Sequence, residues 1–342
     1  MRQLGQYCLR IIIQMTNLDI RKPIIFALAL DGRGGATEIP SDDLSKSLNS
    51  SKAVWIHLDQ TSIKSRETLE NLYPHLSNTT ISALLTEDVR GRAVERDGGI
   101  LAVIRGANLH EGQQPEHMIS LRCFLSSSEI ITVRKYKAFA IEDVKRSLSK
   151  GNGPSNSTEF MTSLSEFFLQ NLIGELDQLE DQIDSLEELV MDQHDNSSGE
   201  SILEVRRSVH HFLRHLEPQV DVYHFFSNST LPWMEEKSKI QFHDLHHEFS
   251  RIVADLKSWR ERTRLIQDEL GNSLSKRLDQ KLYLLAVLTA IFLPLSFMTG
   301  LFGINLGGMP GANEPWAFWT FTFLILALAA LEIYIFKSRK WF

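Results

Sequence analysis

The chain has 342 residues, of which 43% are hydrophobic, and it carries a formal net charge of −7. An acidic chain of this size does not present the broadly basic surface of a nucleic-acid-binding protein, so we expect no nucleic-acid partner. The two cysteines, Cys8 and Cys123, match no metal or redox spacing. With no phosphate loop or catalytic motif either, we expect neither an enzyme nor a resident cofactor.

The N-terminal part of the chain carries the pattern of a mixed α/β domain. Residues 1–23 are expected to be an extension, in which Met15 is an alternative start, and residues 24–150 form the domain. Apolar or alternating runs predict strands at 24–30, 54–59, 100–106, 118–125 and 130–134. Helical spacing occurs at 64–76, 80–85 and 138–148. The polar, breaker-rich segment 150–157 marks the domain boundary.

An acidic helical hairpin is predicted over residues 158–230. Its first helix carries apolar residues in steps of four and three, which form a heptad seam: Leu172, Leu176, Leu179, Ile183, Leu186 and Val190. Residues 175–195 contain nine carboxylates and no Lys or Arg. These acids solubilise an exposed helix face and would also concentrate divalent cations. Pro218 is expected to kink or interrupt the second helix.

A long stalk helix is predicted over residues 231–281, and it continues into the first apolar span. Its seam is Leu245, Phe249, Ile252, Leu256, Trp259, Thr263, Ile266 and Leu270. Some seventy continuous helical residues would extend ~100 Å. Because one chain could not bury such a rod, the pattern predicts a symmetric oligomer.

Two apolar spans near the C-terminus are long enough to cross a bilayer. They are residues 282–303 and 316–336, separated by the loop 304–315 and followed by the basic tail 337–342. Lys and Arg flank the spans, whereas the loop carries only Glu314, which could attract cations or be solvated. By the positive-inside rule both termini face the cytoplasm. Glu332 is expected to reach the interface, with a proton relay as the less favoured role.

One stripe of the first span is lined with small, polar or aliphatic residues. It comprises Leu282, Leu285, Thr289, Leu293, Ser296 and Gly300. Periodicity alone favours tight helix packing over a pore lining. The Asn305 amide in the glycine-rich turn shifts the balance, because several symmetric copies would form a ring of amide oxygens.

The run from Ile291 to Asn305, which ends in Gly303-Ile304-Asn305, resembles the end of the first membrane helix in CorA-type divalent-cation channels. Those channels carry Gly-Met-Asn, and the Leu306–Gly311 continuation is most similar to the zinc-transporting ZntB-type branch. Further matches are Phe26–Gly35, Trp55–Asp59, Glu87–Arg92, Ile100–Leu109, Met118–Arg122 and Lys337–Phe342. The resemblance covers residues 24–342. Ile304 departs from the magnesium signature and puts magnesium selectivity in doubt.

The resemblance implies a funnel-shaped homopentamer in the bacterial inner membrane. An α+β cytoplasmic domain with a mixed sheet would precede a coiled-coil stalk and two transmembrane helices. Asn305, with the carbonyls of Gly303 and Ile304, would meet the hydrated ion at the outer mouth. Leu282 and Leu285 would form a constriction, and the rest of the stripe would line the conduit.

Seven of the twelve histidines fall between His210 and His247. His211 and His215 are spaced i,i+4, as are His243 and His247, so each pair could place two imidazoles on one helix face. A solvated helix surface is the favoured interpretation and metal binding is the alternative. No His-Glu-x-x-His arrangement supports a metalloprotease.

The leading hypothesis is transport of Zn²⁺, with Cd²⁺, Ni²⁺ and Co²⁺ as further candidates. Uptake is the expected direction because a negative interior favours cation entry, and proton coupling is left open. A magnesium or cobalt channel is the first alternative. A non-conducting, membrane-anchored coiled-coil sensor is the second, although it gives the Gly303-Ile304-Asn305 loop no purpose.

Overall fold

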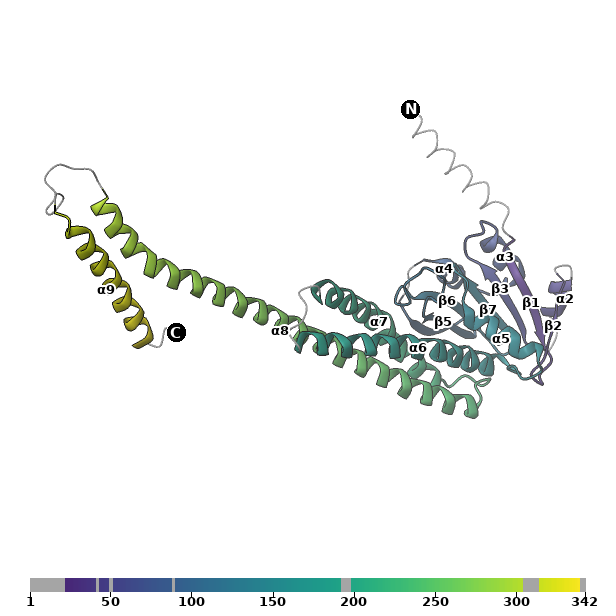
Figure 1. The fold of residues 1–342 in the computed structure, drawn as a ribbon. Helices are drawn as coiled ribbons and strands as arrows, with labels where there is room; N and C mark the ends of the chain where they lie inside the picture. The colour runs from purple at the N-terminus through teal and green to yellow at the C-terminus, as the bar shows by residue number, and fades with distance from the viewer. Residues whose placement is uncertain are drawn as a thin grey trace, which may run out of the picture. The chain divides into compact units, whose positions relative to one another are not determined.

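The structure is a computed structural model that describes residues 22–40, 43–48, 52–87, 90–191, 198–303 and 314–338. The chain divides into two compact units, with the boundary between Gln267 and Asp268. The first unit contains a sheet with its helices, and the second contains two apolar helical segments (Figure 1).

A seven-stranded sheet lies in the first unit, with the order β2-β1-β3-β7-β6-β5-β4. The strands are β1 (Ile24–Leu30), β2 (Ala36–Glu38), β3 (Val54–Asp59), β4 (Arg92–Arg96), β5 (Gly99–Gly106), β6 (Ile119–Leu125) and β7 (Glu129–Arg134). β3 and β7 pair in parallel, with Val54 opposite Glu129. The other neighbouring strands are antiparallel. The prediction of a mixed sheet is therefore confirmed.

All five predicted strands are present, and the two that the sequence did not reveal are the outermost ones. β2 has three residues, and β4 reads Arg-Ala-Val-Glu-Arg. Edge strands need less apolar surface than central strands because one side faces solvent, and charges there discourage pairing with other chains. Such strands lack the alternation from which the central strands were predicted.

Both faces of the central strand β3 are buried. Val54, Ile56 and Leu58 belong to a core that includes residues of α3 (Ser65–Leu72) and α4 (Asn78–Leu85). Trp55 points to the opposite face, where its ring lies 4.6 Å from that of Phe160. This alternation follows from the two-residue period of a strand. Two further helices are α2 (Leu44–Leu48) and α5 (Phe139–Ser149).

Three long helices follow: α6 (Ser157–Met191), α7 (Ser198–Ser227) and α8 (Glu236–Phe302). All six residues of the predicted α6 seam are buried. Pro218 lies inside α7 without ending it, so the predicted interruption is wrong. The next residue, Gln219, is fully buried and accepts a hydrogen bond from the backbone N–H of Arg105 at 2.7 Å. This hydrogen bond connects α7 to β5 directly after Pro218, the residue that lacks a backbone donor.

Part of the α8 seam is covered by the chain itself, which differs from the prediction that only other copies could cover it. From Leu245 to Ile266 its residues are buried within the single chain. Phe242 and Phe249 of α8 contact Phe226 and Tyr223 of α7, with ring centroids 4.7 Å apart in both pairs. This stretch therefore needs no second copy to cover it. α8 begins at Glu236, slightly later than the predicted start at 231.

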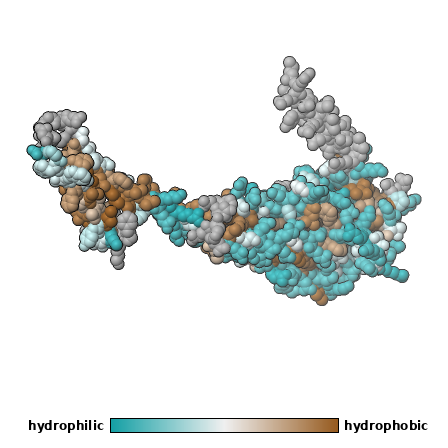
Figure 2. All heavy atoms as spheres, viewed as in Figure 1, coloured by the Kyte–Doolittle hydropathy of each residue, from teal (hydrophilic) through white to brown (hydrophobic). Residues whose placement is uncertain are grey.

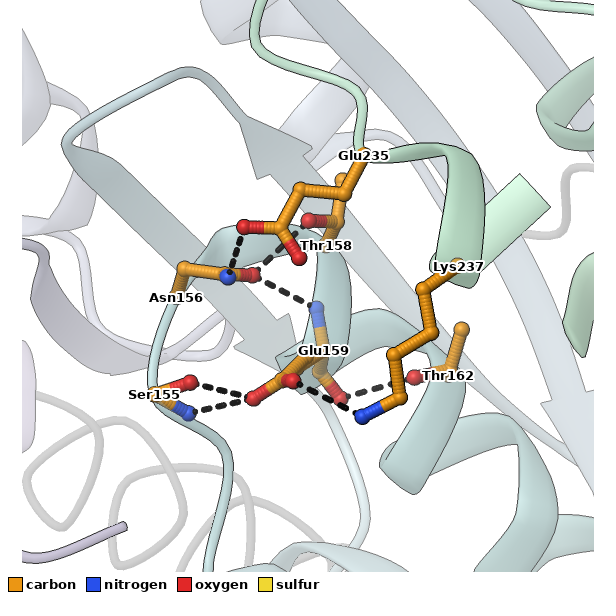
Figure 3. Close-up of polar contacts among 7 residues, drawn as sticks. All are labelled: Ser155, Asn156, Thr158, Glu159, Thr162, Glu235 and Lys237. Atoms are coloured by element: carbon orange, nitrogen blue, oxygen red, sulfur yellow. Dashed lines mark hydrogen bonds and ion pairs between the residues drawn. The ribbon is translucent and has the colours of Figure 1, made fainter. Parts of the chain in front are cut away.

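A polar cluster caps α6 and connects it to the start of α8 (Figure 3). The Asn156 Oδ1 atom accepts the Glu159 N–H at 2.8 Å, and its Nδ2 atom donates to Glu235 at 2.8 Å. Glu159 in turn accepts the Ser155 N–H at 3.0 Å and pairs with Lys237 at 3.5 Å. Burial alone would raise the pKa of Glu159, but these donors outweigh it and lower that pKa. The two helices are thus anchored together at their N-terminal ends.

The second unit contains the last part of α8 and α9 (Ala317–Ser338). Both helices are long and apolar enough to cross a membrane. Figure 2 shows hydrophobic residues gathered over them, whereas the surface of the sheet domain is largely hydrophilic. α8 ends at Phe302 and α9 runs from Ala317 to Ser338, within two residues of the predicted end of the first span and the predicted bounds of the second.

Candidate functional site

Residues 282–302 at the end of α8 form an apolar segment that stays helical despite Pro294. Proline removes one backbone donor, which leaves the Ala290 carbonyl without its helical partner. Membrane helices tolerate such positions because neighbouring groups and local adjustment satisfy the freed carbonyl. The segment therefore has the length and continuity that the candidate pathway requires.

The predicted pore stripe lies on the exposed side of this segment. Leu282, Leu285 and Leu293 are each more than 60% exposed, whereas Val287 is only 5% exposed. Ile291 and Met298, which follow Val287 in helical steps, are half-buried. At ~100° per residue, the stripe and this covered face are about 180° apart. The stripe is therefore exposed, although residues outside it, such as Phe292 and Phe297, are exposed to a similar degree.

A shallow groove of about 520 Å³ follows the N-terminal half of the stripe. Its lining includes four predicted pore residues, Leu282, Leu285, Thr289 and Leu293, together with Ala286, Ala290 and Pro294. The Thr289 hydroxyl donates to the Leu285 carbonyl at 2.8 Å, so its oxygen keeps acceptor capacity toward the groove. The remaining stripe residues, Ser296 and Gly300, are also exposed. An ion passing this face would meet aliphatic side chains and single hydroxyl groups.

α9 contacts the end of α8. The rings of Phe302 and Phe321 lie 4.8 Å apart and join the end of one helix to the start of the other. Glu332 is half-buried, and among the described residues its Oε2 atom has no hydrogen-bond partner. That oxygen is therefore shielded from solvent, and the movement of Glu332 to the membrane interface stays a prediction.

The loop between the helices is only partly described. The Gly303 N–H donates to the Thr299 carbonyl at 2.9 Å and so completes the last turn. Ile304 and Asn305 lie outside the described residues. Glu314 is exposed, and its carbonyl accepts the Ala317 N–H at 3.1 Å, at the start of α9. The proposed roles of Asn305 and of the Glu314 carboxylate stay predictions.

The predicted histidine pairs have different environments. The His243 and His247 Nε2 atoms lie 3.3 Å apart on the exposed side of α8. His211 instead has a ring contact with His117, at a centroid distance of 5.4 Å. Burial and the neighbouring His117 lower the pKa of His211 and keep its imidazole neutral. No group of three or more metal-ligating side chains occurs among the described residues.

Sequence spacing did not reveal which histidines meet across helices. The His246 ring lies 5.2 Å from that of His224 on α7 and 5.6 Å from that of His247. Periodicity along one helix can pair His243 with His247, but it cannot place α7 beside α8. His224 and His246 were therefore seen only as members of a histidine-rich region.

The acidic face of α6 is partly neutralised by α8. Arg262 forms an ion pair with Asp184 at 2.6 Å and a second with Glu187. Exposed pairs of this kind contribute little to stability, but they lower the local negative potential. The nine carboxylates therefore act on cations less strongly than their number suggests.

Comparison with known proteins agrees with this architecture. The family model described as "CorA-like Mg2+ transporter protein" matches residues 50–338, which is most of the chain. The chain belongs to the CorA-like family. It is 31% identical over 317 residues to the zinc transport protein ZntB of Pectobacterium carotovorum, covering 93% of this chain and 95% of that one.

Other relatives in the CorA-like family support the same fold. The divalent cation transporter CmaX of Pseudomonas aeruginosa is 30% identical over 321 residues, covering 93% of this chain and 96% of that one. A structure of full-length CmaX has a TM-score of 0.82 at 29% identity, covering 94% of this chain and 99% of that one. The CorA magnesium transporter of Methanocaldococcus jannaschii has a TM-score of 0.77 at 20% identity, covering 93% and 99%. The mixed sheet, long helix and two apolar helices are thus an arrangement shared with solved CorA-like structures.

Proposed function

We propose that this protein is a bacterial inner-membrane transporter that passes hydrated divalent cations, with Zn²⁺ as the main substrate. The observation that carries the proposal is the exposed stripe of α8 in a chain of the CorA-like family. Several copies arranged around one axis would enclose this stripe and bury its exposed leucines. We propose five copies, with both termini in the cytoplasm.

In this arrangement, Asn305 and the carbonyls of Gly303 and Ile304 receive the ion at the outer mouth. A ring of amides carries no formal charge, so it replaces outer-shell hydrogen bonds rather than the tightly held inner water. Thr289 and Ser296 offer hydroxyl groups along the conduit, and Leu282 and Leu285 form the narrow, apolar end. The Glu314 carboxylate raises the cation concentration near the mouth.

The substrate assignment is supported by the relatives named for zinc transport and by Ile304 in place of the Met of magnesium channels. Dehydrated Zn²⁺ prefers nitrogen and sulfur ligands, which the stripe does not offer. The ion therefore passes hydrated, and Cd²⁺, Ni²⁺ and Co²⁺ are expected to follow the same path. Uptake is the proposed direction, with proton coupling as a feature to be tested.

A flux assay with one metal at a time tests the substrate. Purified protein in liposomes that contain a zinc-sensitive dye should give Zn²⁺ entry, and excess Mg²⁺ should compete weakly. Strong Mg²⁺ competition would favour the second candidate, a magnesium channel. The description of the family names Mg²⁺ as the transported ion. Absence of flux from intact oligomers would contradict both assignments.

A further inference from the structure

Two imidazoles on the exposed side of α8 are arranged as a chelating pair. His243 and His247 are one helical turn apart, and their Nε2 atoms lie 3.3 Å from each other. Their ring centroids are 4.4 Å apart with an interplanar angle of 75°. At this distance the two nitrogens can share one proton, so one ring donates and the other accepts.

The same separation suits two ligands of one metal ion. Two Zn–N bonds of ~2.05 Å at a tetrahedral angle place the nitrogens ~3.3 Å apart. We propose that His243 and His247 form a two-imidazole binding site for a divalent transition metal such as Zn²⁺, Ni²⁺ or Cu²⁺, on the cytoplasmic part of α8. Rotation of the two exposed rings directs both Nε2 lone pairs at the ion, with the N–H proton of each neutral ring on Nδ1.

The surroundings of the pair favour a cation. The His246 Nδ1–H donates to the Val220 carbonyl at 3.2 Å, which leaves its Nε2 as an acceptor beside His247. Arg251, one turn beyond His247, is engaged by Glu248 at 2.6 Å. Lys239, one turn before His243, is paired with Glu236 at 2.7 Å. The basic side chains one turn from either end of the pair are therefore engaged by carboxylates, and their charge opposes metal binding less.

The ligand set selects the class of metal. Neutral imidazoles suit Zn²⁺, Ni²⁺ and Cu²⁺, whereas Mg²⁺ prefers oxygen ligands and gives up its water reluctantly. No third metal-ligating side chain completes a site with the pair in the described parts of the chain, so water fills the other positions. We expect a site that does not bind Mg²⁺ and that exchanges its bound transition metal readily.

Metal binding by the full-length protein in detergent tests the proposal independently of transport. Zn²⁺ is titrated by calorimetry in excess Mg²⁺ into wild-type protein, into a His243→Ala/His247→Ala variant and into a His210→Ala control. His210 is an exposed histidine of α7 outside the pair. The double variant should lose one Zn²⁺ per chain, and single variants should bind it about tenfold more weakly or worse, since even supporting partners of a metal ligand are worth ~10–100-fold.

A spectroscopic measurement identifies the ligands. One equivalent of Cu²⁺ should give an electron paramagnetic resonance spectrum with two coupled nitrogens in wild type and in His210→Ala, but not in the double variant. Equal Zn²⁺ binding by wild type and the double variant, or its absence from wild type, would overturn the proposal. An equal loss in His210→Ala would do the same. Zinc flux is not part of this readout, so failure of transport would leave the result unaffected.

Discussion

The aromatic rings of Phe302 and Phe321 lie 4.8 Å apart and connect the last turn of α8 to the first turns of α9. Val287 is buried, and the stripe from Leu282 to Gly300 lies about 180° around the helix from it at ~100° per residue. The assignment of the stripe to the pore stays a prediction, which labelling can test.

Cysteine labelling separates the two faces of α8. A Ser296→Cys variant in liposomes should react with a small, charged thiol reagent, and the modification should block flux. A Met298→Cys variant, on the face of Val287, should react slowly and keep its flux. The readout is the fraction of protein modified over time, measured by mass spectrometry.

The native cysteines are not expected to react with the thiol reagent in this experiment. Cys123 is fully buried, and burial raises the pKa of its thiol, so it is expected to be unreactive. Cys8 lies outside the described residues and is replaced by Ser in all variants. Equal labelling at positions 296 and 298, or faster labelling at 298, would contradict the assigned orientation.

The buried His57 predicts acid sensitivity of the sheet domain. Burial and the positive charges of Arg134 and Lys145 lower its pKa to about 3, whereas an unfolded histidine titrates near ~6.5. The unfolded state therefore binds the proton more tightly below pH ~6.5. Stability from this residue is fully present above that pH and is lost by about 1.4 kcal/mol per pH unit as the pH falls toward 3.

Thermal melts of the full-length protein between pH 7 and pH 4 measure this effect, with His57→Phe as the test variant. This substitution keeps an aromatic ring beside Phe26, on which His57 stacks at 5.0 Å. Its stability should depend less on pH than that of wild type. His210→Gln, which changes an exposed histidine of α7, should retain the wild-type slope, and an unchanged slope in His57→Phe would refute the explanation.

The cap of α6 should contribute measurably to stability. Replacing Asn156 with Ala removes the acceptor for the Glu159 N–H and the donor to Glu235. Loss of such a cap typically costs ~1 kcal/mol. Chemical unfolding monitored by circular dichroism should show this loss for Asn156→Ala and a smaller one for Asn156→Asp, which keeps the capping oxygen. No difference between the two would indicate that the cap contributes little.

Gly106 allows α6 to approach the sheet. A Cβ atom at this position would overlap the Phe168 ring of α6. We expect Gly106→Ala to destabilise the protein by ~1–3 kcal/mol, the usual cost of overpacking. Adding Phe168→Leu should restore part of the loss, whereas additive losses in the double variant would show that the two positions do not clash.

The sequence was most informative about features that depend on a single helix or strand, such as its position and its buried face. Period-two alternation located the central strands, and the seam of α6 predicted its buried residues. Relations between distant elements could not be obtained in this way. The α8 seam gave no sign that α7 covers part of it through Phe226 and Tyr223, so the stretch from Leu245 to Ile266 gives no reason to expect several copies.

The same limit applied to the candidate site. Spacing gave the i,i+4 relation of His243 and His247, but not the His224–His246 contact or the burial of one Glu332 oxygen. These depend on which helix faces are neighbours, and helical periodicity has no such information. The stripe could be proposed from the sequence because a single helix carries all six of its residues, and its role in a pore stays a prediction.

The most direct test of the proposed pathway is Zn²⁺ flux through Asn305→Ala in liposomes, compared with wild type at equal oligomer content. If a ring of amides admits the hydrated ion, the variant should assemble normally and lose nearly all of its flux. Wild-type flux from correctly assembled Asn305→Ala protein would contradict the account.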